Sequence, residues 1–82
     1  MKAIRLEPNV PAEIRAIDRH ATITILRAIH RYTETGTGRV KALSGAFEGF
    51  LRLRVGSHGV FFEETADAIT VHHVSNRKDA YR

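Results

Sequence analysis

The chain has 82 residues, a length that allows one domain with one small core and leaves no room for a second. It contains no cysteine, which excludes a disulfide framework and a thiolate zinc site. The formal net charge of +4, with 27% charged and 43% hydrophobic residues, excludes a disordered chain and weakly favours a polyanionic partner.

The first half of the chain is predicted to contain one strand and two helices. Residues 2–7 alternate imperfectly and predict a short strand. The apolar spacing across residues 10–17 predicts a short helix that begins near Pro11, a residue suited to a first helical turn. Asp18 is a suitable N-cap for a second helix over residues 19–33. The apolar stripe of that helix consists of Ala21, Ile25, Ala28, Ile29 and Tyr32.

The second half predicts three strands, over residues 50–56, 60–63 and 69–75. Turn residues separate them at 56–59 and 65–67, so the strands are expected to form an antiparallel meander. The predicted fold class is α+β: an N-terminal strand, a helical hairpin and a three-stranded antiparallel meander, with the helices on one sheet face.

Arg52 and Arg54 are the strongest candidate functional residues. Strict alternation places Leu51, Leu53 and Val55 on one side of their strand and both arginines on the other. Such a pair can bind successive phosphates or stabilise the charge that develops on a phosphate during cleavage. The alternative is a solvated basic sheet face with no ligand.

The C-terminal segment, residues 76–82, is a second candidate region. If the third meander strand runs beside the first, Arg77, Lys78 and Arg82 extend the basic patch. Tyr81 then offers a ring for stacking on a base or a hydroxyl for proton transfer. The alternative is a frayed, charged terminus.

The chain also has five histidines: His20, His30, His58, His72 and His73. Their spacing does not match a helical metal site, and we expect neither a metal nor another cofactor. His72 and His73 are adjacent on a predicted strand and are expected to face opposite sides. Either is a possible general acid or base, with a packing or surface role as the alternative.

Three motifs occur in order: Leu43-Ser-Gly45, Phe50-Leu-Arg-Leu-Arg-Val-Gly56 and Asn76-Arg-Lys-Asp-Ala-Tyr81. On these motifs, and in the order of its predicted elements along essentially the whole chain, the sequence resembles RelE/ParE-type toxins of toxin–antitoxin pairs. The resemblance implies an mRNA endonuclease that acts in the ribosomal decoding site without a metal and leaves a 2′,3′-cyclic phosphate.

The resemblance also implies roles for individual residues. Arg52 and Arg54 correspond to a phosphate-binding pair, Arg77 to a charge-stabilising arginine, and Tyr81 to a tyrosine that stacks on the base or helps to move a proton. Further RNA contacts are expected from Lys41, Lys78 and Arg82.

The sequence departs from the family pattern at three positions. Gly59 stands where the family usually has an arginine, His58 where an aromatic residue is usual, and Asn76 where histidine is frequent. Loss of one charge-stabilising donor typically costs on the order of 10²–10³ in rate. Three explanations stay open: His58 supplies the missing cation or acid, the toxin is weakened, or the chain is not a nuclease.

The resemblance implies a cognate antitoxin as partner, beside the ribosome and mRNA. An acidic, partly disordered antitoxin tail is expected to bind the second helix and the edge of the meander.

Two alternative functions stay open. The chain is either a ParE-like protein that inhibits DNA gyrase by protein contact, or an inactive family member that only binds antitoxin. No stretch reaches the roughly 18 apolar residues of a membrane span, and no signal peptide is recognised, so the expected location is the cytoplasm, with no membrane partner.

Overall fold

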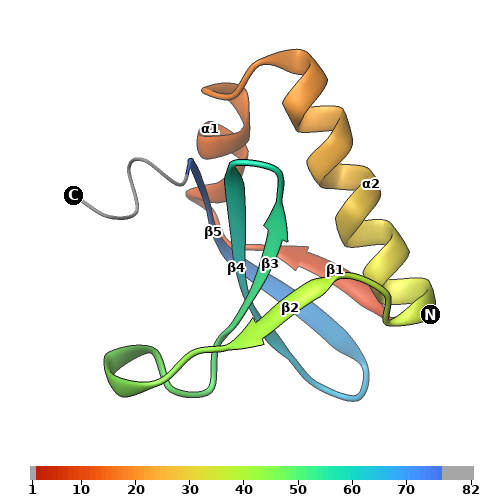
Figure 1. Ribbon diagram of the computed structural model, residues 1–82, viewed down its shortest axis with the longest axis vertical. Coiled ribbons are helices and arrows are strands. Elements are labelled where there is room, and N and C mark those ends of the chain that lie inside the picture. The colour runs from red at the N-terminus through yellow and green to blue at the C-terminus, as the bar shows by residue number, and fades with distance from the viewer. Residues whose placement is uncertain (1, 77–82) are drawn as a thin grey trace.

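The computed structural model describes residues 2–76, and the elements follow one another in the predicted order (Figure 1). The first half contains β1 (Ala3–Leu6), α1 (Val10–Arg15) and α2 (Arg19–Thr35). The second half contains β2 (Arg39–Ala42), a 3₁₀ turn (Gly45–Phe47), β3 (Leu51–Val55), β4 (His58–Glu64) and β5 (Ala68–Asn76). None of the helices in this part of the chain has the length and apolar character that crossing a bilayer requires.

The five strands form one mixed sheet in the order β1-β5-β4-β3-β2. β1 runs parallel to β5, and the other neighbours are antiparallel. The α+β class is confirmed, but the meander has four strands rather than the predicted three. Moreover, β5 lies beside β4 and not beside β3, so the strand arrangement on which the predicted tail patch was conditional does not occur.

Local chemistry explains both ends of α2. The Asp18 side chain accepts a hydrogen bond of 3.0 Å from the Ala21 N–H, which confirms the predicted N-cap. The helix ends at Gly36, whose positive φ of 72° favours glycine and terminates the helical hydrogen bonding. α2 therefore runs two residues beyond the predicted end at Thr33.

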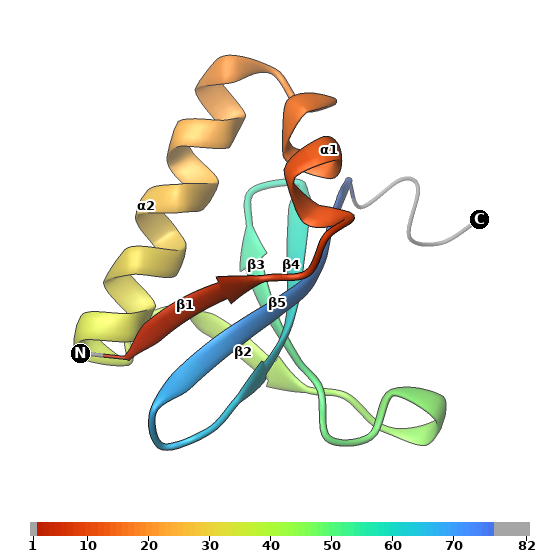
Figure 2. The same cartoon turned by 180° about the vertical axis from the view of Figure 1, so that it is seen from behind.

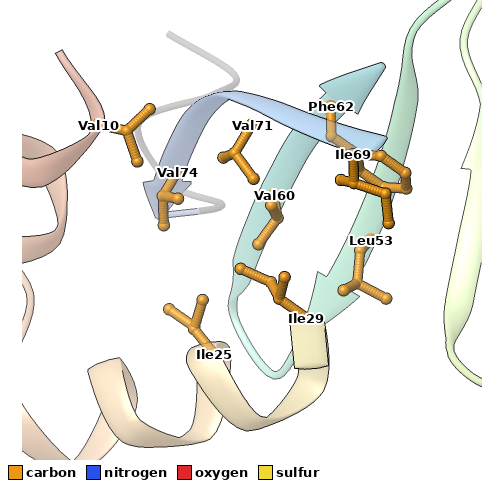
Figure 3. Packing of buried hydrophobic residues seen from close by; sticks show 9 residues of the cluster. All are labelled: Val10, Ile25, Ile29, Leu53, Val60, Phe62, Ile69, Val71 and Val74. Carbon is orange, nitrogen blue, oxygen red and sulfur yellow. The ribbon is translucent and has the colours of Figure 1, made fainter. Parts of the chain in front are cut away.

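The core lies between the two helices and one face of the sheet (Figures 2 and 3). α1 contributes Val10 and α2 contributes Ile25 and Ile29. The strands contribute Leu53, Val60, Phe62, Ile69, Val71 and Val74. Because strand side chains alternate, the strand residues that lie between the core residues project from the other face of the sheet, away from the helices. We call that side the open face, and it carries Arg39, Lys41, Arg52, Arg54, Gly59, Phe61, Glu63, Thr70, His73 and Ser75.

A β-bulge in β5 changes the predicted placement of the two adjacent histidines. Phe61 pairs with His73 and Phe62 with Val71, so His72 is the extra residue. His72 Nε2 lies 2.7 Å from Oε1 of Glu63, which alternation places on the open face. His73 is on the open face through its pairing with Phe61. The expectation that the two histidines face opposite sides was therefore wrong, because regular alternation does not hold through a bulge.

Candidate nucleic-acid interface

Two transverse rows of side chains cross the open face. Cross-strand partners in an antiparallel pair project from the same face, so the register defines each row. The first row runs from β2 to β5 through Lys41, Arg52, Phe61 and His73. The second row runs through Arg39, Arg54, Gly59 and Ser75. Two cations at the β2–β3 end of each row give the open face four positive charges.

The four cations lie opposite one another in like-charge pairs, Lys41 with Arg52 and Arg39 with Arg54. Like charges directly across a ladder are destabilising, by up to about 1 kcal/mol a pair. Within residues 2–76 no carboxylate forms an ion pair with any of them, because the carboxylates that contact a basic side chain there contact Lys2 or a histidine. An unneutralised basic surface of this kind favours an anionic ligand.

Arg52 lies flat across the neighbouring strand. A Cβ atom built on Gly59 would come within 2.8 Å of Arg52 Nε, so the guanidinium occupies the space above this glycine. Arg52 Cζ is 5.9 Å from the centre of the Phe61 ring, within range of a cation–π interaction. Its Nε is buried and has no hydrogen-bond partner among the described residues. A buried donor left unsatisfied costs about 1–3 kcal/mol, so stability alone does not account for this position.

Two adjacent pockets share Arg52 as a wall. One, of about 330 Å³, has a largely apolar lining that includes Leu43, Phe47 and Phe61, together with His73. The other, of about 470 Å³, is lined by cations from both neighbouring strands: Arg39, Lys41, Arg52 and Arg54. Aromatic side chains stack on nucleobases, whereas arginine and lysine bind phosphates. The two pockets together suit a nucleotide whose base and phosphate lie on either side of Arg52.

Glu13 of α1 binds the strand beside this site. β1 pairs with β5 only as far as Leu6, so within residues 2–76 the backbone of β5 beyond Val71 has no strand on that side. Glu13 Oε1 accepts the Val74 N–H at 2.8 Å in place of a strand, and Oε2 lies 3.1 Å from His73 Nδ1. Burial alone would raise the pKa of Glu13, but hydrogen bonds from Val74, Asn9 and His73 outweigh it and lower the pKa.

Asn9 completes this arrangement from the turn before α1. Its Nδ2 donates to Glu13 Oε2 at 3.0 Å and to the His72 carbonyl oxygen at 2.9 Å. The Glu13 carboxylate is therefore held by three donors from two elements. It follows that the position of the His73 ring is defined by α1 as well as by its own strand.

The predicted site residues are only partly brought together. Arg52, Arg54 and Lys41 lie on one face. His58 pairs with Val55 and shares the opposite face, where it lines a pocket with Ile17 and Asp18, so it does not join the arginines. Four predicted residues lie outside the part of the chain that the structure describes: Arg77, Lys78, Tyr81 and Arg82.

Several residues of the site were missed from the sequence: Glu13, Arg39, Phe47 and Phe61, with His73 named only as one of two possibilities. The basic segment Arg39-Val-Lys41 was the available signal, since it alternates like an edge strand. No local signal indicates that Glu13 meets His73, because the two are 60 positions apart. Among the described residues, no group of three potential ligands is arranged to hold a metal ion.

Comparison with solved structures identifies the fold. The sequence matches no protein-family model and no curated protein sequence. A crystal structure of the RelB–RelE antitoxin–toxin complex from Methanococcus jannaschii matches with a TM-score of 0.77 at 20% identity, over 94% of each chain. The YafQ mutant H87Q from E. coli matches with a TM-score of 0.79 at 7% identity, over all of both chains. The YoeB–YefM complex from Staphylococcus aureus gives a TM-score of 0.75 at 12% identity, over 92% of this chain and 95% of the other. The predicted fold class is thus confirmed, and the chain has the fold of the RelE and YafQ toxins.

Proposed function

We propose that this protein is the toxin of a toxin–antitoxin pair and that its open face binds and cleaves mRNA on the ribosome. The observation that carries the proposal is the open face itself, with four cations that lack carboxylate partners within residues 2–76 beside an aromatic pocket. A bound mRNA would place a phosphate at Arg52 and Arg54 and a base against Phe61 and Phe47.

Cleavage in this proposal is an internal transesterification. The ribose 2′-oxygen forms a bond to the adjacent phosphorus, and the bond from phosphorus to the 5′-oxygen breaks with its electron pair on that oxygen. The products are a 2′,3′-cyclic phosphate and a 5′-hydroxyl. Negative charge grows on the phosphate oxygens in the transition state, and the guanidinium groups of Arg52 and Arg54 stabilise it. Lys41 adds a phosphate contact. The tail residues Arg77, Lys78, Tyr81 and Arg82 lie outside the described residues, and their part in the proposal rests on the resemblance to RelE/ParE-type toxins alone.

The cognate antitoxin is expected to bind α2 and the β2 edge of the sheet. Ile23 and Leu26 project from α2 into solvent, with 42% and 45% of their surfaces exposed. Among the described strands β2 has a neighbour on one side only, so its other edge can accept an added strand. RelE and YoeB are found in complexes with RelB and YefM, respectively, which supports a protein partner for this chain too. If a co-purified antitoxin left Ile23, Leu26 and β2 accessible to labelling, this assignment would be wrong.

The proposal is tested by inducing the chain alone in bacteria, in the cytoplasm where the ribosomes are. We expect growth arrest and new 5′ ends within translated regions of a reporter mRNA. Arg52→Ala and Arg54→Ala should each reduce cutting about 10²–10³-fold. Arg19→Ala removes the same charge from the start of α2 and should cut like the unchanged chain. Arrest without RNA cleavage would contradict the nuclease proposal and direct the next assay to gyrase inhibition.

A further inference from the structure

The contact between Glu13 and His73 has the form of a carboxylate that orients a proton-transfer histidine. His73 Nδ1 lies 3.1 Å from Glu13 Oε2, and its side chain is 59% exposed. An exposed contact of this kind contributes little to stability, but it restricts the orientation of the ring. We propose that His73 is the residue that removes the proton from the attacking 2′-hydroxyl and that Glu13 is its positioning residue. This inference rests on the proposed function, because it assigns a role within RNA cleavage.

The Glu13 carboxylate determines which ring nitrogen carries hydrogen. An ionised carboxylate can only accept hydrogen bonds, so the 3.1 Å contact requires hydrogen on Nδ1 of His73. The Asn9 Nδ2 group also lies 3.4 Å from Nδ1, but this longer contact would need the other tautomer, and Asn9 already donates to Glu13 and to the His72 carbonyl oxygen. In the neutral ring the other nitrogen, Nε2, then carries a lone pair and can accept a proton. Asn9 and the Val74 N–H bind the same carboxylate, which prevents it from turning away from His73.

The position of His73 in the first transverse row suits this task. Phe61 lies between Arg52 and His73, so the two residues are separated by two strand spacings. At the usual spacing between strands this is about 10 Å from Cα to Cα. With the phosphate at Arg52 and the base against Phe61 and Phe47, the ribose would lie between Arg52 and His73, with its 2′-hydroxyl toward His73. Both residues line the same pocket, together with Phe61 and Phe47.

The proton balance of the step is simple. Nε2 of His73 takes the hydrogen of the 2′-hydroxyl as the 2′-oxygen bonds to phosphorus. The 5′-oxygen leaves with the electron pair of its bond to phosphorus and takes a proton from water. His73 then returns its extra proton to water, which restores the starting state.

The other described histidines are placed less well for this step. His58 lies on the opposite sheet face. His72 has Nε2 bound to Glu63 and its ring stacked on Phe50, with 4.8 Å between the ring centres. His20 and His30 belong to α2, and His30 lies 3.3 Å from Glu34. His73 is thus the histidine within residues 2–76 that shares a pocket with Arg52.

The test is single-turnover cleavage of mRNA on purified ribosomes, measured as a function of pH. In the unchanged protein the rate should rise with pH along an acidic limb, because the base must be neutral. The charged side chains in its pocket are Glu13 from α1 and Arg52 from β3. His73→Gln should lower the rate about 10²–10⁴-fold and remove that limb. A substitution that lowered the rate only by disturbing the structure would leave the acidic limb of the pH profile in place.

Two further variants make the test specific. Glu13→Gln keeps an acceptor for Val74 but donates to Nδ1 of His73, which moves the hydrogen to Nε2 and should lower the rate about 10²-fold or more. His30→Gln is the matched control on α2 and should behave like the unchanged chain. Thermal unfolding of each variant verifies that it is folded.

The outcomes separate the two proposals. If the unchanged protein cleaves and His73→Gln keeps the rate or the acidic limb, the role of His73 is refuted while the nuclease proposal stands. If the unchanged protein does not cleave at stoichiometric concentration, the nuclease proposal fails, and the role of His73 fails with it.

Discussion

Arg52 rests on Gly59: the guanidinium lies over the backbone of the neighbouring strand, and a Cβ at position 59 would come within 2.8 Å of Nε and 3.3 Å of a terminal nitrogen. By its resemblance to RelE/ParE-type toxins, the sequence has Gly59 where an arginine is expected. The structure gives this glycine a positive role, because only a residue without a side chain leaves room for Arg52 in this position. In this arrangement the Arg52 guanidinium lies over position 59, where the resemblance leads us to expect an arginine.

Gly59→Ala is the most direct probe of this contact. The added methyl group should push Arg52 away from Phe61 and lower RNA cleavage about 10-fold, a part of the loss that removing one donor causes. The free energy of unfolding should stay the same or rise by up to about 1 kcal/mol, because alanine is favoured over glycine in a strand. Cleavage kinetics and denaturant unfolding of the same preparation measure both effects.

A double-mutant cycle controls this experiment. In an Arg52→Ala background the further change Gly59→Ala should have no effect on cleavage, since the displaced side chain is already absent. Gly59→Arg should likewise fail to increase cleavage, because the new side chain needs the space that Arg52 occupies. A more active Gly59→Arg protein would show that Gly59 is simply a defect.

The four cations of the open face should make RNA binding dependent on salt. For a single strand the slope of log K against log [salt] is about −0.7 for each phosphate neutralised, so four contacts give about −3. Removing both β2 cations, in Arg39→Ala/Lys41→Ala, should reduce the slope to about −1.5. A 2′-O-methyl RNA oligonucleotide, which lacks the attacking hydroxyl, is a suitable probe. The double variant Arg15→Ala/Arg19→Ala removes the same charge from the helices, and an equal effect from it would contradict a defined binding face.

Much of the fold could be predicted from local patterns, and the site could be predicted only in part. The strict alternation of residues 51–55 identified β3 and both arginines, and Asp18 identified the start of α2. β2 was not predicted from the sequence, because its four residues include only two apolar ones, Val40 and Ala42. Of these two, Ala42 is a weak strand signal. Its pairing with β3 is what places Arg39 and Lys41 opposite the arginines. This register is a tertiary property.

The bulge at His72 and the contact of Glu13 with His73 were also missed because they depend on tertiary structure. A bulge adds one residue to a strand without any local mark in the sequence, so the placement of His72 was predicted from a regular ladder. The contact of Glu13 with His73 depends on where β1 ends and α1 begins to cover β5. Both depend on the packing of segments that lie far apart in the chain.

Tyr32 should give the folded protein a distinct alkaline transition. Burial, together with its 2.7 Å hydrogen bond to Glu64, raises the pKa of Tyr32 from 10.0 to about 12. Below pH 10 the phenol is protonated in both states, and its contribution to stability is fully present. As the pH rises from 10 toward 12, only the unfolded chain ionises, so the free energy of unfolding falls. Absorbance at alkaline pH should show one late-ionising tyrosine that Tyr32→Phe removes. Ionisation of Tyr32 near pH 10 would contradict the contact with Glu64.

A conservative substitution of Phe62 should measurably lower the stability of the core. It is 1% exposed, and its ring meets Tyr32 edge to face with 5.4 Å between the ring centres. Phe62→Leu keeps an apolar side chain but loses the ring contact, so we expect a cost of about 1–2 kcal/mol. For a domain of this size the loss lowers the melting temperature by roughly 4–8 °C per kcal/mol. No change in melting temperature would show that the ring pair contributes nothing.

The central claim, that the open face cleaves mRNA, is tested most directly with purified protein and ribosomes carrying a defined message. The measurement is the appearance of a 2′,3′-cyclic phosphate end on the mRNA, for the unchanged chain and for Arg52→Ala. We predict a cyclic end within the translated codons for the unchanged chain and a yield about 10²–10³-fold lower for Arg52→Ala. No cyclic end from the unchanged chain, or an equal yield from both proteins, would contradict the account.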